Sequence, residues 1–497
     1  MLEETQREHM IKDRTERIAA GKIAVIGLGI SNRALLRYLE NIGAKNVWLL
    51  EKTDTEEMRE TAETLQAEGK LAGYVLGGEY LEPVGGGGFD FIFRSPIIRP
   101  DEPHIARAVE EGAELTSEME VFMENCPCRI LAVTGSDGKT TTTTLTAELL
   151  KRHFAGTDVK IWLGGNIGTP LIDKLSEIGP EDIAVLELSS FQLMKISVSS
   201  SASVITNITP NHLNVHKDYA EYIWAKENIF RMPDHSGGKF GKTRVVLNAG
   251  NEVTADIARK LAPLGGGTVD AFTAKSAPEA AFSLPHNGAT AVLEAGKIRV
   301  IDPEGREILN IPREMLLLPG LHNVENFMAA ALLTREYITQ EDAEAVATHF
   351  KGVEHRLERV RVLRGVTYIN SSIDSSPERT INALTVFPGK NIVLIAGGKD
   401  KGIPYDALGP SLADKCKALV LTGPTADKIE AALKATGRGE DIPVIRAETY
   451  SEAVSAAAGL AEEGDIVLCS PASTSFDMFR NFEERGNTFK SLVNALE

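Results

Sequence analysis

Cysteine, long apolar runs and excess positive charge are all scarce in this 497-residue chain. The cysteines are Cys126, Cys128, Cys416 and Cys469, and one CxC pair with two distant singles fits neither a disulfide framework nor a zinc ribbon. No apolar run reaches the roughly 18 residues that a membrane helix needs, and the charged N-terminus lacks the apolar core of a signal peptide. These shortages predict a cytoplasmic protein with reduced thiols and no membrane span.

The acidic balance of the chain narrows its partners further. The formal net charge is -17, which argues against nucleic acid or an anionic membrane as the main partner. If the ligands are themselves anionic, local lysines, backbone amides and metal ions must hold them against the overall field. We therefore expect small-molecule partners and no nucleic acid.

Alternating strand-like and helix-like segments fill three successive blocks of the sequence. This alternation predicts an α/β protein of three domains with mainly parallel sheets. We expect a Rossmann-like domain at 1–127, a central P-loop ATPase-like domain at 128–352 and a C-terminal Rossmann-like domain at 353–497. The stretch 263–318 reads as a β-rich excursion of short strands and turns. Ligands of such sheets gather at the carboxyl ends of the strands.

The segment "TGSDGKTTTTT" at 134–144 follows a predicted strand and opens a predicted helix. Small residues let backbone N–H groups curl around phosphate oxygens, and the helix N-terminus favours the same anion. Val133 stands where the longer GxxxxGK[ST] loop has glycine, so the loop is a shorter GxxGKT form. The predicted phosphate-binding residues are Gly135, Ser136, Asp137, Gly138, Lys139, Thr140 and Thr141. The hydroxyls of 142–144 either make polar contacts near the loop or only cap and pack the helix.

Polar side chains also follow two neighbouring predicted strands. Glu187 ends one strand and His212 follows another, so together with Thr140 they could hold hard cations between phosphates. Alternatively, Glu187 is a surface acid and His212 a turn residue. Asn166 lies on a glycine turn and is a plausible substrate contact. Lys226 lies on a predicted helix, and its pattern alone indicates an ordinary solvated lysine.

The first glycine turn, "GLGISN", departs from the dinucleotide-binding motif GxGxxG. Asn32 replaces the third glycine, which normally permits close packing of helix on strand. Glu51 still ends the next predicted strand, where an acid would contact a ribose or a base. A nucleotide-like ligand therefore remains the prediction, whereas NAD itself is disfavoured.

Taken in order, these motifs resemble those of the Mur ligase family across nearly the whole chain. The resemblance is carried by "VIGLGIS", "SPII", "GSDGKTTT", "GNIGTP", "LELSSFQL", "PNHLNVH", "GLHNVENFMAA", "HRLE", "GGKDKG" and "SPASTSFDMFRNFEERG". It implies an ATP-dependent amide-bond-forming enzyme of peptidoglycan synthesis that uses two Mg²⁺ ions. The last two motifs most resemble the members that add D-glutamate to UDP-N-acetylmuramoyl-L-alanine, and we expect a monomer.

The resemblance also implies roles for individual residues. The UDP-sugar would be bound by Gly29, Ser31, Asn32, Glu51, Lys52, Thr53, Ser95, Pro96, Asn166 and Gln192. ATP would be contacted by the phosphate loop together with Asn323, Arg356 and Asp374. The catalytic residues would be Lys139, Glu187, His212 and Lys226, with Thr140, Glu187, His212 and a carbamylated Lys226 holding metal. D-Glutamate would be held by Ser375, Lys401, Ser475, Phe476 and Phe482.

Some positions depart from the family pattern, which leaves other functions open. Asp137 replaces a more usual asparagine, Ile97 replaces a glycine, and Ser371 stands where an acid is common, with Asp374 three residues later. The alternatives are a related Mur or folylpolyglutamate-type ligase for another amino acid, and a nucleotide-binding regulator that ligates nothing. An NAD-dependent oxidoreductase is disfavoured by the missing third glycine and by the phosphate loop.

Overall fold

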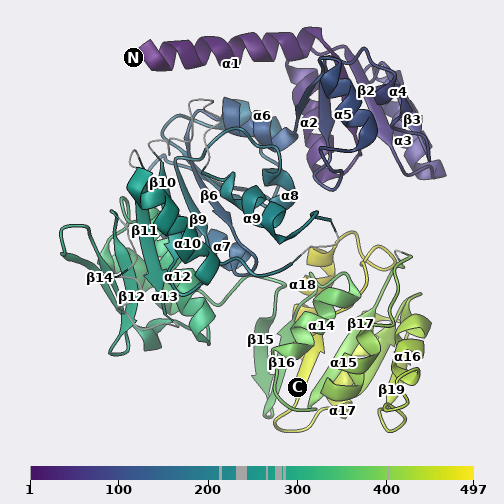
Figure 1. Cartoon of the computed structure of the whole chain (residues 1–497). Coiled ribbons are helices and arrows are strands. Elements are labelled where there is room, and N and C mark those ends of the chain that lie inside the picture. The colour runs from purple at the N-terminus through teal and green to yellow at the C-terminus, as the bar shows by residue number, and fades with distance from the viewer. Residues whose placement is uncertain are drawn as a thin grey trace. The chain divides into compact units, whose positions relative to one another are not determined.

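The computed structural model confirms the predicted α/β class and its mainly parallel sheets (Figure 1). It describes residues 2–211, 215–230, 243–264, 267–274, 283, 287–400 and 402–497. Two compact units divide the chain, residues 1–350 and residues 351–497. Over these described ranges, the first unit holds a five-stranded and a nine-stranded sheet, and the second holds a six-stranded sheet. The three-way domain boundaries drawn from the sequence stay a prediction.

The first sheet has the strand order β3-β2-β1-β4-β5, and every pairing in it is parallel. Its strands are β1 (Lys22–Ile26), β2 (Asn46–Glu51), β3 (Gly73–Leu76), β4 (Phe91–Arg94) and β5 (Glu114–Thr116). Its helices are α2 (Ile30–Asn41), α3 (Glu56–Ala67), α4 (Glu82–Gly85), α5 (Pro103–Glu110) and α6 (Glu118–Asn125). The strand order reverses between β1 and β4, and ligands bind such sheets outside that switch point. The turns after β1 and β4 both lie there.

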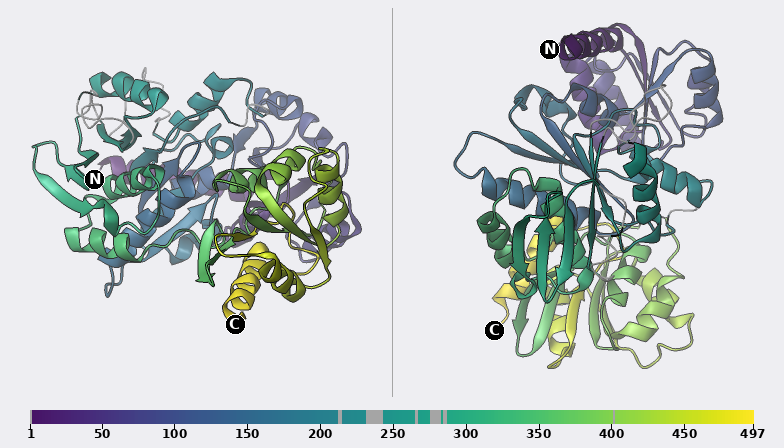
Figure 2. Two further views of the ribbon diagram at one scale, coloured as in Figure 1. Left: turned by 90° about the horizontal axis from the view of Figure 1, so that it is seen from below. Right: turned by 60° about the vertical axis from the view of Figure 1, so that its left-hand side comes forward.

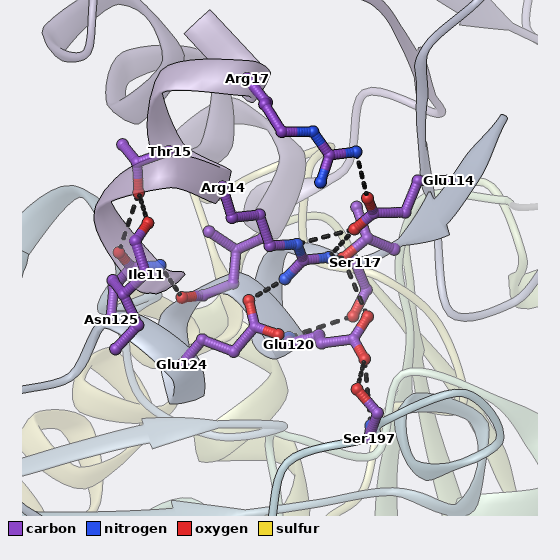
Figure 3. Close-up of polar contacts among 12 residues, drawn as sticks. Ile11, Arg14, Thr15, Arg17, Glu114, Ser117, Glu120, Glu124, Asn125 and Ser197 are labelled. Carbon is purple, nitrogen blue, oxygen red and sulfur yellow. Dashed lines mark hydrogen bonds and ion pairs between the residues drawn. The ribbon is translucent and has the colours of Figure 1, made fainter. Parts of the chain in front are cut away.

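Helix α1 (Leu2–Ala20) is fastened to this sheet by buried and charged contacts. Ile18 lies in the apolar core, while Arg14 pairs with Glu114 of β5 and with Glu124 of α6 (Figure 3). On the same helix α6, a carboxylate oxygen of Glu120 accepts hydrogen bonds from the backbone and hydroxyl of Ser197, at 3.0 and 2.6 Å. Because Ser197 lies beyond strand β8 (Ile183–Glu187) of the central sheet, this contact ties the two sheets of the first unit together.

The central sheet has the order β14-β13-β12-β11-β10-β9-β6-β8-β7. Its strands are β6 (Arg129–Thr134), β7 (Ile161–Gly165), β8 (Ile183–Glu187), β9 (Ala202–Ile205), β10 (Arg244–Asn248), β11 (Thr268–Thr273), β12 (Thr290–Glu294), β13 (Lys297–Ile301) and β14 (Glu307–Pro312). Strands β12 to β14 pair antiparallel, as the predicted β-rich stretch requires, and the others pair parallel. The inner strands are apolar on both faces because helices cover both.

Helices pack on both faces of the central sheet. They are α7 (Lys139–His153), α8 (Ser190–Leu193), α9 (Tyr219–Glu227), α10 (Glu252–Leu261), α12 (Leu321–Thr334) and α13 (Gln340–His349), with short 3-10 turns η1 (Ile172–Glu177), η2 (Ala262–Leu264) and η3 (Arg313–Met315). Buried residues of α7, α12 and α13 form one core, and those of α8 and α10 join the core shared with the first sheet.

The second unit is a three-layer α/β fold, green to yellow in Figure 2. Its sheet order is β15-β16-β20-β17-β18-β19, and only the edge strand β15 pairs antiparallel. The strands are β15 (Glu358–Leu363), β16 (Val366–Asn370), β17 (Ile392–Gly397), β18 (Cys416–Thr422), β19 (Val444–Ala447) and β20 (Ile466–Cys469). The helices are α14 (Pro377–Thr385), α15 (Leu408–Lys415), α16 (Ala426–Lys434), α17 (Tyr450–Leu460) and α18 (Phe482–Ala495). Among the described residues, no helix has the length and apolarity to cross a membrane.

Candidate active site

The predicted phosphate loop joins β6 to α7, and two of its glycines are required by geometry. Gly138 caps α7 with φ of 79°, in the left-handed region, and a Cβ there would overlap the side-chain oxygen of Asn326. Gly135 has φ of 149°, and a Cβ there would overlap the hydroxyl of Thr206. Both positions therefore exclude any larger residue, for reasons of backbone strain and of close approach.

The end of the neighbouring strand β9 holds this loop in shape. The backbone N–H of Ser136 donates to the carbonyl of Asn207 at 2.8 Å, and that of Asp137 donates to the Asn207 side chain at 3.1 Å. The Thr206 hydroxyl donates to the carbonyl of Asp137 at 2.6 Å. The loop is thus fixed before any ligand arrives, with the N-terminus of α7 behind it, which is the arrangement that binds phosphate.

Two lysines converge on this loop. The ammonium group of Lys139 donates to the carbonyls of Gly135 and Ser136 at 3.0 and 2.8 Å, and that of Lys226 donates to Gly135 at 2.7 Å. Lys226 is 1% exposed and lies 4.6 Å from the centre of the Tyr222 ring. Its burial, together with the charge of Lys139, lowers the pKa of Lys226 well below its ordinary value. The interpretation of Lys226 as a solvated lysine is therefore wrong.

Glu187 ends β8 as predicted, and its carboxylate is only half satisfied. One oxygen accepts a hydrogen bond from the side chain of Asn166 at 2.8 Å. The other oxygen is buried and has no hydrogen-bond partner among the described residues. A buried, unpartnered carboxylate oxygen beside a phosphate loop fits a hard cation such as Mg²⁺. Glu187 is thus not the surface acid of the alternative interpretation, since 1% of it is exposed.

The structure describes some of the predicted metal-binding residues and not others. Thr140, the second residue of α7, is buried, and Asn166 supports Glu187 through its side chain. His212 lies outside the described residues. Within the described ranges, no cluster of three or more histidine, cysteine, aspartate or glutamate side chains is arranged as a metal site. A cation there would need oxygen ligands of other kinds, such as hydroxyl, phosphate and carbamate groups.

The threonine run serves mainly to build the helix. The hydroxyls of Thr143 and Thr144 donate to the carbonyls four residues earlier, at 2.8 Å each, and Thr142 donates to the side chain of Asn326 at 3.3 Å. Asn326 in turn donates to Asn323, at 3.2 Å, so the predicted ATP contact Asn323 is connected to the phosphate loop. Sequence patterns gave no reason to select Asn326, which only folding places against Gly138.

The crevice of the first sheet is organised by Glu51 and Asn32. The two carboxylate oxygens of Glu51 accept hydrogen bonds from the backbone N–H groups of Leu28 and Thr53, at 2.7 and 2.8 Å. The Asn32 side chain is buried and donates to the carbonyls of Ile26 and Gly27 at 3.0 and 2.8 Å. Both side chains therefore shape the turn after β1 from within. The exposed predicted residues at this edge are Gly29, Lys52 and Thr53, and the half-buried ones are Ser31, Ser95 and Pro96.

Gln192 has a structural partner in the first turn of α8. Its side-chain oxygen accepts hydrogen bonds from the backbone and hydroxyl of Ser189, at 2.9 Å each, which completes a capping box. The contact of Gln192 with the sugar substrate stays a prediction.

In the second unit, buried polar contacts tie together the two segments predicted to hold D-glutamate. Ser470 donates to a carboxylate oxygen of Asp374 at 2.8 Å, and burial raises the pKa of Asp374. Arg485, which the sequence patterns did not single out, is fully buried and donates to the carbonyls of Ser372 and Ser473 at 2.9 and 3.1 Å. Its guanidinium therefore fixes the loop after β16 against the loop after β20.

The remaining predicted residues of this unit differ in exposure. Ser475 is buried, Ser375 is half-buried, and Phe476 is 60% exposed. Phe482 begins α18 and meets the ring of His355 edge-on, at 6.0 Å between centroids. Arg356 follows His355, and Lys401 lies outside the described residues. Ala472, between these segments, is held at φ of 55°, a conformation that costs energy for a non-glycine residue.

Comparison with known proteins identifies the family that this chain resembles. Residues 133–334 match the Mur ligase middle domain, and residues 355–473 match the domain described as Mur ligase, glutamate ligase domain. A protein of Ruminiclostridium cellulolyticum named UDP-N-acetylmuramoylalanine--D-glutamate ligase is 45% identical over 482 residues, which cover 96% of this chain and 97% of the relative. This chain belongs to the Mur ligase family.

Other comparisons agree with membership of the Mur ligase family. A relative with the same name from Acetivibrio thermocellus is 46% identical over 491 residues, which cover 98% of this chain and 99% of the relative. A crystal structure of MurF from Acinetobacter baumannii has a TM-score of 0.50 and 16% identity, with 79% of this chain and 87% of that chain covered. That likeness supports the fold alone. Mur ligases use ATP and Mg²⁺, in agreement with the phosphate loop and with Glu187.

Proposed function

We propose that this chain joins D-glutamate to UDP-N-acetylmuramoyl-L-alanine at the expense of ATP, with release of ADP and phosphate, in peptidoglycan synthesis. One observation carries the proposal. The carbonyl of Gly135 in the phosphate loop accepts hydrogen bonds from Lys139 and from Lys226, a buried lysine whose pKa is lowered. The relatives that bear this ligase name match 96% and 98% of the chain. We propose that the reaction takes place in the cytoplasm, since it consumes ATP. We also propose that the enzyme is a monomer.

The first step would activate a carboxylate. A carboxylate resists attack by an amine, so its oxygen is first made a leaving group by transfer of the γ-phosphoryl group from ATP, which forms an acyl phosphate and ADP. The backbone N–H groups of the first turn of α7 and the ammonium of Lys139 would hold the phosphates, since the N–H groups of Ser136 and Asp137 already donate to Asn207. Lys139 would have to exchange its present carbonyl acceptors for phosphate oxygens, which are stronger acceptors because they are charged.

Lys226 fits the role of a carbamate precursor because of its surroundings. Only the unprotonated amine adds CO₂, and burial beside Lys139 favours that form. The addition joins the nitrogen of the neutral amine to the carbon of CO₂, releases one proton and leaves an anionic pair of oxygens. Those oxygens, the Thr140 hydroxyl, Glu187 and His212 are the groups proposed to hold two Mg²⁺ ions. When bound, Mg²⁺ would neutralise charge that develops on the transferring phosphoryl group.

The second step would form the amide. The unprotonated amine of D-glutamate attacks the acyl carbon, a tetrahedral intermediate forms, the nitrogen gives up one proton, and phosphate leaves with the bonding electrons. Ser375, Lys401, Ser475, Phe476 and Phe482 are proposed to hold D-glutamate. Support for this comes from Arg485, which fixes the loops that carry Ser375 and Ser475 against each other.

A panel of amino acids tests the proposal. Purified protein is incubated with ATP, Mg²⁺ and UDP-N-acetylmuramoyl-L-alanine, and phosphate release and product mass are measured for D-glutamate, L-glutamate, L-alanine, L-lysine and diaminopimelate. Turnover with D-glutamate alone is expected. Lys139→Met should abolish it, whereas Lys151→Met, on the exposed face of the same helix, should not.

Two other results would each overturn the proposal. Turnover with L-lysine or diaminopimelate but not with D-glutamate would point to a related ligase. Nucleotide binding without turnover of any amino acid would point to a regulator.

A further inference from the structure

Arg94 and Arg99 stand at the two ends of the loop that follows β4, and each contacts a helix beside the central sheet. Between them lie Ser95 and Pro96, which belong to the predicted sugar-nucleotide site. Arg94, 1% exposed, donates to the carbonyls of Pro96 and Ile98 at 3.1 and 2.8 Å. It also donates at 2.8 Å to the carbonyl of Phe191, which lies in α8, four residues beyond Glu187. One guanidinium thus shapes the loop and joins it to the helix that follows the candidate metal ligand.

Arg99, at the other end of the loop, reaches α9. Its two terminal nitrogens donate to the two carboxylate oxygens of Glu221, at 2.8 and 2.9 Å. One of them also donates to the carbonyl of Val215 at 2.6 Å, and the remaining nitrogen donates to Asp101 at 2.7 Å. The paired geometry fixes direction as well as distance. Arg99 holds the pKa of Glu221 down, at about 2, so the pair stays charged across the working range of pH.

The two arginines therefore connect one loop to α8, which follows Glu187, and to α9, which carries Lys226. Glu221 precedes Lys226 by five residues, on the same helix, and Phe191 lies one residue before Gln192. Burial lowers the pKa of Arg94 to about 10, which reflects the cost of keeping its charge away from water. An apolar side chain of similar volume would avoid this cost but would leave three carbonyl groups without their donor.

We propose that Arg94 and Arg99 are positioning residues that couple sugar-nucleotide binding to the phosphate and metal site. They hold the loop of Ser95 and Pro96 in register with α8 and α9, so that the carboxylate of a bound sugar nucleotide meets the γ-phosphate. Binding of either ligand then favours binding of the other, and the coupling is equal in both directions. The inference depends on the proposed ligase function, since it concerns the same substrates.

The test measures this coupling directly. Affinity for UDP-N-acetylmuramoyl-L-alanine is measured by calorimetry with and without Mg²⁺ and a non-hydrolysable ATP analogue, beside kcat and KM for each substrate. In the wild type, the analogue should tighten sugar-nucleotide binding. Arg99→Gln should remove that gain and lower kcat about 10- to 100-fold, as loss of supporting hydrogen bonds does at other sites. Affinity for either ligand alone should change little.

Matched variants separate positioning from folding. Arg37→Gln breaks an ion pair between α2 and Asp173 of η1, at 2.7 Å, that does not touch the loop, so it should leave the coupling intact. Glu221→Gln should reproduce Arg99→Gln, and the double variant should lose no more than either single one, because one pair carries the effect. Arg94→Lys should retain more coupling than Arg94→Met. Thermal unfolding identifies any variant that fails to fold.

The outcomes are distinct from those of the amino-acid panel. If the wild type turns over D-glutamate but shows no coupling, or if Arg99→Gln leaves coupling and kcat unchanged, the inference fails while the ligase function stands. If Arg37→Gln removes coupling as fully as Arg99→Gln, the role is general packing and the inference fails too. If the wild type turns over no amino acid, the proposed function itself fails.

Discussion

Lys139 and Lys226 share one acceptor, since both ammonium groups donate to the carbonyl oxygen of Gly135, at 3.0 and 2.7 Å. Burial, and next to it the nearby charge of Lys139, lowers the pKa of Lys226, which therefore loses its proton more readily. The residue that would contact phosphate thereby helps to prepare the residue that would carry a carbamate. The arrangement joins the two predicted roles through one backbone atom.

Replacing Lys226 tests the proposed carbamate. Lys226→Ala should lower turnover on the order of 100-fold, because a charged ligand of the cation would be lost. Formate or acetate should restore part of the activity by filling the same space, and wild-type protein equilibrated with ¹³C-bicarbonate should show a carbamate carbon by NMR. Lys151→Ala, on the exposed face of α7, serves as the control. Full activity in the Lys226→Ala protein would eliminate this role.

Substitution of Gly138 tests the shape of the phosphate loop. Gly138→Ala should destabilise the fold by about 1–2 kcal/mol through backbone strain alone, and more through overlap with Asn326. ATP affinity should fall with it, because Asn326 also anchors Thr142. Urea unfolding and calorimetry measure the two effects. Gly459→Ala, inside α17 and with open space around the added methyl, should be neutral or stabilising.

The buried Glu118, at the start of α6, predicts a pH dependence of stability. Burial raises its pKa to about 8, and one carboxylate oxygen has no partner among the described residues. Above the ordinary glutamate pKa, the unfolded chain releases this proton while the folded chain keeps it. Stability should therefore fall as pH rises from about 4.5 to 8, by up to about 1.4 kcal/mol per pH unit, and then level off.

A neutral substitution should remove this slope. Glu118→Gln should be more stable than the wild type at pH 8 and nearly equal to it at pH 4.5, in urea unfolding at a series of pH values. Glu56→Gln is matched, since Glu56 also begins a helix, α3, but is exposed. A wild-type slope that persists in Glu118→Gln would contradict the assignment.

Asn32→Gly would complete the dinucleotide-binding motif in the sequence, but it should lower the stability of the protein. Two hydrogen bonds of a buried side chain, to the carbonyls of Ile26 and Gly27, would be lost, at a cost of about 1–3 kcal/mol. Chemical denaturation should show this loss, and NADH fluorescence should show no gain of binding. Asn32→Ala, which loses the same bonds without adding a flexible backbone, should be slightly less impaired.

Local patterns in the sequence were sufficient to locate the strands, the loop between β6 and α7, and Glu187 at the end of a strand. The spacing of Gly135, Gly138 and Lys139 sets the loop because strand, turn and helix are contiguous there. Burial of Lys226 could not be predicted in this way, since its own helix reveals only periodicity, and its neighbours come from the phosphate loop, α7 and the rest of α9. Its proposed role as a carbamate came from resemblance to a family, which covered nearly the whole chain.

Asn326, Arg94 and Arg485 show where sequence reasoning stops. Each acts on segments far away in the chain, on Gly138, Phe191 and Ser372 respectively. No spacing rule predicts such a meeting, because tertiary packing alone decides which carbonyl or loop a long side chain reaches. Asn32 is a further case. It departs from the dinucleotide-binding motif, but its side chain forms hydrogen bonds that hold the turn after β1.

The antiparallel strands β12–β14 extend the central sheet on the side away from the phosphate loop. Five strand steps separate β13 from β6, which is about 24 Å across the sheet. The turn from Asp302 to Arg306 at the end of β13 contains no predicted site residue. A fluorescent dye at Arg306, whose side chain is largely exposed, would thus report by energy transfer on a labelled nucleotide without obstructing it.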